Sequence, residues 1–370
     1  MPLDLDAATD SSSERPSESE LTRLGFSPFF EAQRTDIGES IEPARVVLTS
    51  AAMHRVLTAA GPCLAAVSGR LSHEARSRAD LPAVGDWVGL LPQGASGPRV
   101  IHHIFARRTC LRRKAAGRTT EAQVLAANVD TVFIVTSMNA DFNPRRLERY
   151  LDIVIDSGAR PVIVINKADL CPDPASFLDT AREVAPAVQI AYVSALSGAG
   201  LDELRAHIQP GETVVLVGSS GVGKSALTNR LLGGDHQREG AVRESDDRGR
   251  HTTAHRELFL LPGGGLLIDT PGVRELGLWS TEDASPGGFD DIGALAQACR
   301  FRDCAHEGEP GCAVAHAIAE GTLAPERLDG FRKLAAERRH LAGQQDVRVR
   351  LEEKRRIKQL NRGMRAHPKK

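Results

Sequence analysis

Long apolar runs are missing from this chain of 370 residues. No stretch approaches the ~20 consecutive apolar residues that a transmembrane helix needs, so we expect no membrane span. The N-terminal stretch has neither the basic start nor the apolar core of a secretory signal. Aromatic residues are scarce, at 4% of the chain, but hydrophobic residues make up 41%. We therefore expect a cytoplasmic protein with about two or three domains, each long enough to bury its own core.

A large net charge is missing as well, because the formal net charge is only −1. That balance by itself favours no particular partner. The charges are nevertheless unevenly spread along the chain. Residues 1–40 include an acidic stretch rich in serine, and we expect a disordered tail there. Residues 346–370 are basic, and their side chains are either RNA contacts or a solvated, charged helix end.

Cysteine is scarce, with six in the chain, but three of the six lie close together. Cys299, Cys304 and Cys312 combine with His306 in the pattern C-x4-C-x-H-x5-C. In a cytoplasmic chain such a cluster indicates metal before disulfides. Three thiolates and one imidazole match a tetrahedral, structural zinc site, with free buried cysteines as the alternative. We expect one structural Zn²⁺ in a mostly helical C-terminal domain at residues 281–345.

The strongest chemical signal lies in the sequence GSSGVGKS at residues 218–225. A strand-like run precedes it and a helical run follows it. The G-x-x-x-x-G-K-S spacing lets backbone N–H groups wrap a β-phosphate at the positive end of that helix. We expect Lys224 to act on the β- and γ-phosphates and Ser225 to ligate Mg²⁺. The expected phosphate-binding residues are Gly218, Ser219, Ser220, Gly221, Val222, Gly223, Lys224, Ser225 and Ala226.

Upstream, the motif N-K-A-D follows an apolar strand at residues 161–165. The Asp169 carboxylate can accept hydrogen bonds from guanine N1–H and from the exocyclic amino group, a pair of donors that adenine does not offer. Lys167 can lie along one face of the purine, and Asn166 can brace the neighbouring loops. Together with a phosphate loop in the same domain, this motif favours a guanine nucleotide.

Ser194 and Ala195 follow a shorter strand at residues 188–193. A Ser-Ala pair at a strand end is similar to the backbone segment that covers guanine O6 in GTPases. The pair carries no weight by itself, since such dipeptides are common. Beside the two motifs above, it completes the expected guanine site.

Two segments can sense the γ-phosphate. D-T-P-G ends a third apolar strand, so Asp269 can hold a Mg²⁺-bound water and the Gly272 N–H can meet the γ-phosphate. The polar loop before it contains G-R-H-T-T, in which Thr252 or Thr253 can ligate Mg²⁺ when GTP is bound. Thr252 is slightly favoured. The alternative for this loop is a plain surface loop.

The order of these motifs differs from that of Ras-like domains, in which the phosphate loop comes first. Here the guanine motifs precede it, which is a circular permutation of the same site. Residues 116–280 therefore predict a permuted α/β GTPase domain with a parallel sheet, including a helix from Pro144 to Asp156.

Residues 41–115 alternate short apolar runs with turn residues, which predicts a small antiparallel barrel of the OB type. A basic strip follows the barrel and is either an RNA contact or a solvated linker. The strip comprises Arg107, Arg108, Arg112, Arg113, Lys114 and Arg118.

With these motifs, residues from about 40 to 340 closely resemble the RsgA/YjeQ family of circularly permuted GTPases. The resemblance implies an OB-fold, a GTPase domain and a zinc-binding domain that act late in maturation of the small ribosomal subunit and its rRNA. It also implies slow hydrolysis of GTP to GDP that the subunit accelerates. We expect a monomer.

Val273 stands where Ras-like enzymes place a water-orienting Gln, and Val cannot hold a water. The resemblance suggests His251 of the G-R-H-T-T loop as the replacement, beside Lys224 as the second expected catalytic residue. Two alternatives stay open: a permuted GTPase of large-subunit assembly, and an RNA-binding scaffold gated by nucleotide.

Overall fold

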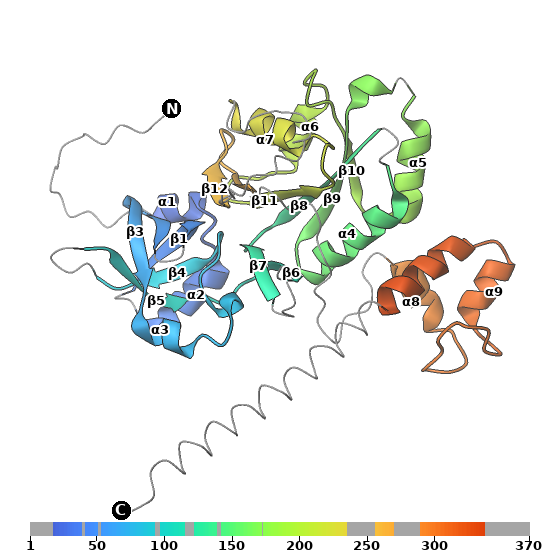
Figure 1. Ribbon diagram of the computed structural model, residues 1–370, viewed down its shortest axis with the longest axis horizontal. Helices are drawn as coiled ribbons and strands as arrows, with labels where there is room; N and C mark the ends of the chain where they lie inside the picture. Colours follow the sequence, from blue (N-terminus) through green and yellow to red (C-terminus); the bar gives the residue numbers. More distant parts are fainter. Residues whose placement is uncertain are drawn as a thin grey trace, which may run out of the picture.

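The computed structural model describes residues 18–38, 41–50, 53–92, 97–114, 122–138, 142–171, 173–234, 256–269 and 289–336. Figure 1 shows a small barrel in the N-terminal part, a larger sheet flanked by helices in the middle, and a helical unit toward the C-terminus. This is the multi-domain arrangement that the sequence predicts. Among the described residues, the helices are all too short or too polar to span a bilayer.

The barrel is built from five strands that close on themselves. They are β1 (Glu42–Thr49), β2 (His54–Thr58), β3 (Gly61–Val67), β4 (Trp87–Leu90) and β5 (Arg99–Ile104). β1 pairs with both β2 and β4, and β3 pairs with β5, which closes the ring. α3 (Gly69–Glu74) lies between β3 and β4 in the chain. The OB-like barrel is therefore confirmed, with small and β-branched side chains such as Val46, Val56 and Ile101 filling its core.

The prediction of a disordered tail is wrong for the second half of residues 1–40. Two helices form there, α1 (Glu18–Arg23) and α2 (Pro28–Ile37), while residues 1–17 lie outside the described part. Phe30 is 1% exposed, and its ring centroid lies 5.9 Å from that of Trp87. Phe26 meets Trp87 edge-on at 4.7 Å. The helices form because Phe26 and Phe30 pack against Trp87 of β4, a gain that composition does not reveal.

We expect Phe30→Ala to destabilise the protein by about 3–5 kcal/mol, since it removes a fully buried aromatic ring. Phe29→Ala is the matched control, because Phe29 is 43% exposed and should cost under about 1 kcal/mol. Urea unfolding followed by tryptophan fluorescence measures both, with Trp87 as a reporter beside the site. Equal costs for the two variants would mean that α2 adds nothing to the barrel.

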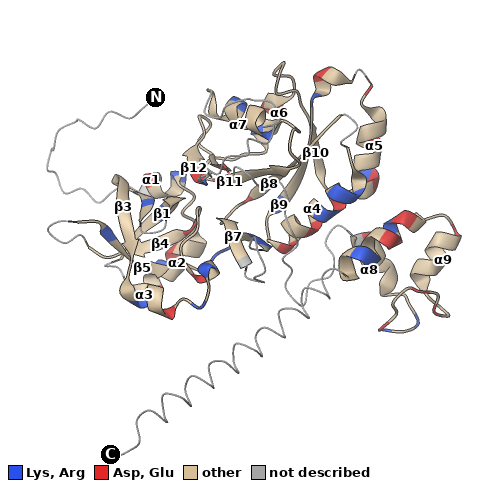
Figure 2. Ribbon diagram, in the orientation of Figure 1, with Lys and Arg blue, Asp and Glu red and all other residues tan. Residues whose placement is uncertain are grey.

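The central domain is a parallel sheet with helices around it. Its elements are β8 (Thr131–Ser137), α4 (Pro144–Asp156), β9 (Arg160–Asn166), α5 (Ala175–Val184), β10 (Gln189–Tyr192), α6 (Leu201–Ala206), β11 (Thr213–Gly218), α7 (Lys224–Leu232), β12 (Glu257–Leu260) and β13 (Leu266–Asp269). The strands lie in the order β10-β9-β8-β11-β13-β12, all parallel except β12. The parallel sheet is confirmed, and α4 has the predicted bounds. Figure 2 shows charged residues mainly on the helices, whereas the central strands are largely uncharged.

The barrel and the central sheet are joined edge to edge, because β1 pairs antiparallel with β12. Arg45 of β1 is 1% exposed at this junction. Its guanidinium donates to the Leu24 carbonyl at 3.4 Å, the Asn128 carbonyl at 3.1 Å and the Thr213 hydroxyl at 3.0 Å. Burial lowers the pKa of Arg45 to about 10, so it remains a cation at pH 7. One buried charge thus ties the N-terminal helices, the barrel and the first residue of β11 together.

The predicted basic strip is divided between different environments. Arg107 forms an ion pair with the buried Asp86 at 2.8 Å and donates to two backbone carbonyls. It is therefore neither an RNA contact nor a linker residue. Arg108 pairs with Asp130, and Arg118 lies outside the described part. The rest of the strip lies on a two-stranded sheet, β6 (Cys110–Lys114) and β7 (Ala122–Ala127), which the sequence did not predict.

The C-terminal unit is helical, as predicted. It contains α8 (Asp290–Ala296), α9 (Ala313–Ala319) and a further helix at 325–336. Arg327 anchors this unit to the central domain: its guanidinium lies 3.4 Å from the Glu148 carboxylate of α4 and donates to the Val184 carbonyl at 3.3 Å. The Phe289 ring covers the guanidinium at 4.9 Å. The unit therefore docks through a partly shielded cation.

Candidate functional site

The phosphate loop joins β11 to α7, as the sequence predicts. Gly218, Gly221 and Gly223 have φ values of 144°, 80° and 95°, which favour glycine. A Cβ at Gly218 would lie 2.2 Å from the Val135 carbonyl oxygen, and a Cβ at Gly223 would lie 2.2 Å from the Asn166 amide nitrogen. Glycine is therefore required by close approach as well as by backbone angle. Residues 218–223 form the loop and residues 224–226 begin α7.

Lys224 lies folded against this loop. Its ammonium donates to the Gly218 carbonyl at 2.7 Å and to the Ser219 carbonyl at 2.6 Å. Arg146, in the first turn of α4, donates to the Ser219 hydroxyl. Two cations thus meet at the loop, and the second of them was not predicted from the sequence. Both raise the positive potential where phosphates would bind.

Asn166 connects the phosphate loop with the segment that begins with Ser194 and Ala195, which we call the guanine segment. The side chain is 1% exposed at the end of β9. Its amide nitrogen donates to the Val222 carbonyl at 2.8 Å, and its amide oxygen accepts from the Ala195 N–H at 3.0 Å. The predicted bracing role of Asn166 is therefore confirmed.

Asp169 lies beside that segment, because the Ser194 hydroxyl donates to its carboxylate. Lys167 takes a left-handed backbone conformation, with φ 65°, between the strand and a short turn of 3-10 helix (Ala168–Leu170). The structure thus brings the N-K-A-D motif and Ser-Ala pair together with the phosphate loop. A carboxylate offers acceptor sites for several donors, so Asp169 can accept from guanine N1–H and its amino group as well as from Ser194.

The remaining predicted residues divide into two groups. Asp269 ends β13, which lies parallel to β11 with Ile268 opposite Val215, so its carboxylate shares a sheet edge with the phosphate loop. Ser225 lies in the first turn of α7. The other predicted switch residues lie outside the described part of the chain: His251, Thr252, Thr253 and Gly272.

Sequence reasoning missed one side chain that contacts the guanine segment. Arg230, in the last turn of α7, donates from Nε to the Ala195 carbonyl and from Nη2 to the Leu196 carbonyl, each at 2.8 Å. Its position on α7 gives no sign of this contact, because the partner segment is 34–35 residues away. No motif spacing could have found it.

The four predicted zinc ligands converge. One donor atom from each of Cys299, Cys304, His306 and Cys312 lies within 4.8 Å of all the others. The Cys299 and Cys312 sulfurs are 4.0 Å apart, and His306 Nδ1 lies 3.6 Å and 3.4 Å from them. Tetrahedral Zn²⁺ with bonds of about 2.3 Å to sulfur and 2.0 Å to nitrogen needs separations of roughly 3.5–3.8 Å. The residues present therefore fit a structural zinc ion.

The electrostatics of the cluster point the same way. Burial lowers the pKa of His306, which keeps the imidazole neutral as a ligand requires. Burial also raises the pKa of Cys304 to about 11. Burial opposes ionisation of Cys299 too, but backbone N–H groups of Ala313 and Val314 lower its pKa overall. Ionisation of Cys304 at neutral pH thus needs a cation beside its sulfur, which Zn²⁺ would supply.

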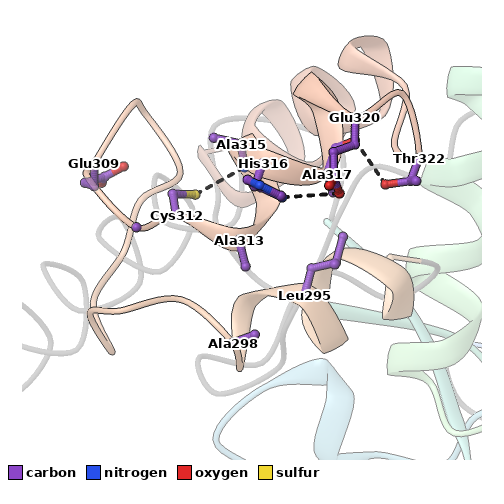
Figure 3. Close-up of a pocket in the computed structure, with 11 residues that line it drawn as sticks. Leu295, Ala298, Glu309, Cys312, Ala313, Ala315, His316, Ala317, Glu320 and Thr322 are labelled. Carbon is purple, nitrogen blue, oxygen red and sulfur yellow. Dashed lines mark hydrogen bonds and ion pairs between the residues drawn. The ribbon is translucent and has the colours of Figure 1, made fainter.

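His316 is a residue of α9 and does not belong to the metal cluster. Its side chain is 71% exposed and pairs with Glu320 at 3.2 Å. Figure 3 shows His316 turned along α9 toward the next turn, while the Cys312 sulfur, at the start of α9, accepts from the Ala315 N–H. A pocket beside α9 is lined by both Cys312 and His316. Cys312 also belongs to the metal cluster, whereas His316 does not.

Comparison with known proteins supports this geometry. Residues 104–279 match the family model of RsgA GTPase. The chain is 45% identical to the small ribosomal subunit biogenesis GTPase RsgA of Opitutus terrae, over 94% of this chain and 97% of that protein. It is 41% identical to the protein of the same name from Syntrophotalea carbinolica, over 92% and 96%. The crystal structure of YjeQ from Thermotoga maritima matches 82% of this chain and 99% of its own, with a TM-score of 0.62 and 25% identity.

The fold and the site together define a circularly permuted GTPase with an OB-like barrel before it and a Cys3His cluster after it. The N-K-A-D motif and the Ser-Ala pair precede the phosphate loop in the chain, yet Asn166 joins all three in space. The chain belongs to the RsgA GTPase family.

Proposed function

We propose that this protein binds and hydrolyses GTP during late maturation of the small ribosomal subunit, and that a GTP-dependent switch controls its binding and release. The observation that best supports GTP binding is that the amide group of Asn166 forms hydrogen bonds with both the phosphate loop and the guanine segment. That contact gives the site one geometry for base and phosphates together. The names of the relatives from Opitutus terrae and Syntrophotalea carbinolica support the assignment to the small subunit.

In this proposal the guanine base binds Asp169, and the phosphates bind residues 218–226. Mg²⁺ bound with GTP would neutralise charge developing on the phosphates. Ser225 and Asp269 would hold that ion, together with Thr252 or Thr253. The Gly272 N–H would contact the γ-phosphate and so distinguish GTP from GDP.

The domain boundaries are proposed as 41–115 for the barrel, 116–280 for the GTPase domain and 281–345 for the zinc-binding domain, with a basic tail at 346–370. The two N-terminal helices are added to the barrel, since Phe30 is buried against it. The rRNA of the small subunit is the proposed partner, and a monomer is the proposed state. Arg112 and Arg113 of β6 are the proposed RNA contacts in the basic strip, because Arg107 and Arg108 are already engaged in ion pairs with Asp86 and Asp130.

We expect purified small subunits to raise multiple-turnover GTP hydrolysis by at least about tenfold, whereas purified large subunits should not. Phosphate release with each subunit measures this. Stimulation by large subunits alone would mean that the protein acts in large-subunit assembly instead. No stimulation by either would favour the RNA-binding scaffold.

His251 is the proposed water-orienting residue, because Val273 cannot orient the attacking water. His251→Ala should therefore lower the stimulated rate by about 10²-fold while GTP still binds. Single-turnover hydrolysis on the subunit, with GTP affinity measured separately, tests this. Stimulated turnover that survives the substitution would mean that another group orients the water.

A further inference from the structure

Arg230 forms hydrogen bonds with two successive peptide groups in the guanine segment. Its Nε and Nη2 donate to the carbonyl oxygens of Ala195 and Leu196, each at 2.8 Å. A guanidinium is a rigid, planar fork, so this contact fixes the orientation of both carbonyls. Arg205 of α6 reaches the same region, where it donates to the Arg230 carbonyl at 3.0 Å.

The orientation of these carbonyls sets the direction of the next two N–H groups. In a trans peptide the C=O and the following N–H point in opposite directions. With the Leu196 carbonyl turned toward Arg230, the Ser197 N–H points away from it, and there it donates to the Ser194 hydroxyl at 3.1 Å. The same hydroxyl donates to Asp169. The chain turns at residues 195–197, and Asp169 therefore lies on the face of this turn opposite Arg230.

The same geometry applies to the peptide group between Ala195 and Leu196. Because its carbonyl points toward Arg230, its N–H points toward the face on which Asp169 lies. The neighbouring N–H groups are already engaged: that of Ala195 by Asn166 at 3.0 Å, and that of Ser197 by Ser194. Among the described residues, the Leu196 N–H has no acceptor. It is thus a free donor beside the proposed base-binding carboxylate.

We propose that Arg230 is a specificity-determining positioning residue, which turns the Leu196 N–H toward O6 of the guanine base. This inference rests on the proposed binding of GTP. Guanine presents an acceptor at position 6, whereas adenine presents an amino donor there that would oppose the N–H. A site built around a hydrogen bond rejects an analogue that cannot make it, because its own polar group is left unpaired.

The test compares three nucleotides in each protein variant. In 6-thio-GTP, sulfur replaces O6 and accepts hydrogen bonds more weakly, while ITP keeps O6 and lacks the amino group. We expect the wild type to bind GTP about three- to tenfold more tightly than 6-thio-GTP. Arg230→Met should bring that ratio close to one and leave the ratio of GTP to ITP, which reports on Asp169, unchanged. Equilibrium competition against a fluorescent GDP measures both ratios.

Arg205→Met is the matched control, since Arg205 contacts the Arg230 carbonyl and the Asp202 carboxylate but not the turn. It should keep both ratios at the wild-type values. Arg230→Lys, which can hold only one carbonyl well, should give an intermediate ratio for 6-thio-GTP. Each ratio is measured within one variant, so partial unfolding does not change it.

Two results would overturn the inference: an unchanged preference for GTP over 6-thio-GTP in Arg230→Met, or an equal loss in Arg205→Met. A wild type that binds GTP no better than ATP would instead contradict the proposed function, before any variant is compared. The two failures are therefore distinguishable.

Discussion

Replacement of Lys224 by alanine should abolish tight GTP binding and turnover together. The ammonium donates to the Gly218 and Ser219 carbonyls, which places it inside the phosphate loop. Without it, those two carbonyl oxygens would face the phosphates with no cation between them. Loss of one partner from a shielded pair of an ammonium and a phosphate costs about 2–5 kcal/mol, or roughly 30- to 5,000-fold in affinity. Titration with a fluorescent GTP analogue and a phosphate-release assay measure the two effects.

Arg146→Met is the matched control for this prediction. Arg146 is a cation at the same loop, but it contacts the Ser219 hydroxyl rather than the loop carbonyls. Its loss should weaken GTP binding by about tenfold or less. If Lys224→Ala bound GTP within tenfold of the wild type, the phosphate site would have to lie elsewhere. Equal losses in the two variants would show that only the summed positive charge matters.

The parts of the site that the sequence predicts are those encoded locally. The loop at residues 218–225 depends on glycine spacing between an apolar strand and a helix, all within one short segment. α4 was predicted with its bounds because Pro144 opens it, the Asn143 side chain caps it and its apolar residues recur on one face. The zinc ligands are likewise close in sequence. In each case the determining residues are neighbours along the chain.

The parts that the sequence does not predict depend on distant partners. Arg45 reads as an ordinary polar residue of a strand, yet its three acceptors come from positions 21, 83 and 168 residues away. Arg230 reads as a solvent-facing residue of α7. The N-terminal helices depend on packing against Trp87 of β4, which is in place only after the barrel has folded. Local propensity cannot encode such contacts, since each is created by the assembled tertiary structure.

The C-terminal unit should lose its fold when its metal ligands are removed. Apparent binding free energies of structural Zn²⁺ are about 10–16 kcal/mol, which matches or exceeds the total stability of a domain at about 5–15 kcal/mol. Cys312→Ser is the sharpest change, because Cys312 is 5% exposed and its sulfur accepts from the Ala315 N–H at 3.4 Å. Serine can keep that helix cap, so unfolding of the variant would report loss of the metal rather than loss of the cap.

Zinc content per chain and hydrogen exchange of the amides in α9 measure the result. We expect Cys312→Ser, or treatment of the wild type with a chelator, to remove the zinc and the protection of α9 together. Cys171→Ser is the control, since Cys171 is a free cysteine outside the cluster and should keep one zinc per chain. The central domain should keep its own protection, because its core is built on β8, β9 and β11. A Cys312→Ser protein with protected α9 and no zinc would mean that the helices fold without metal.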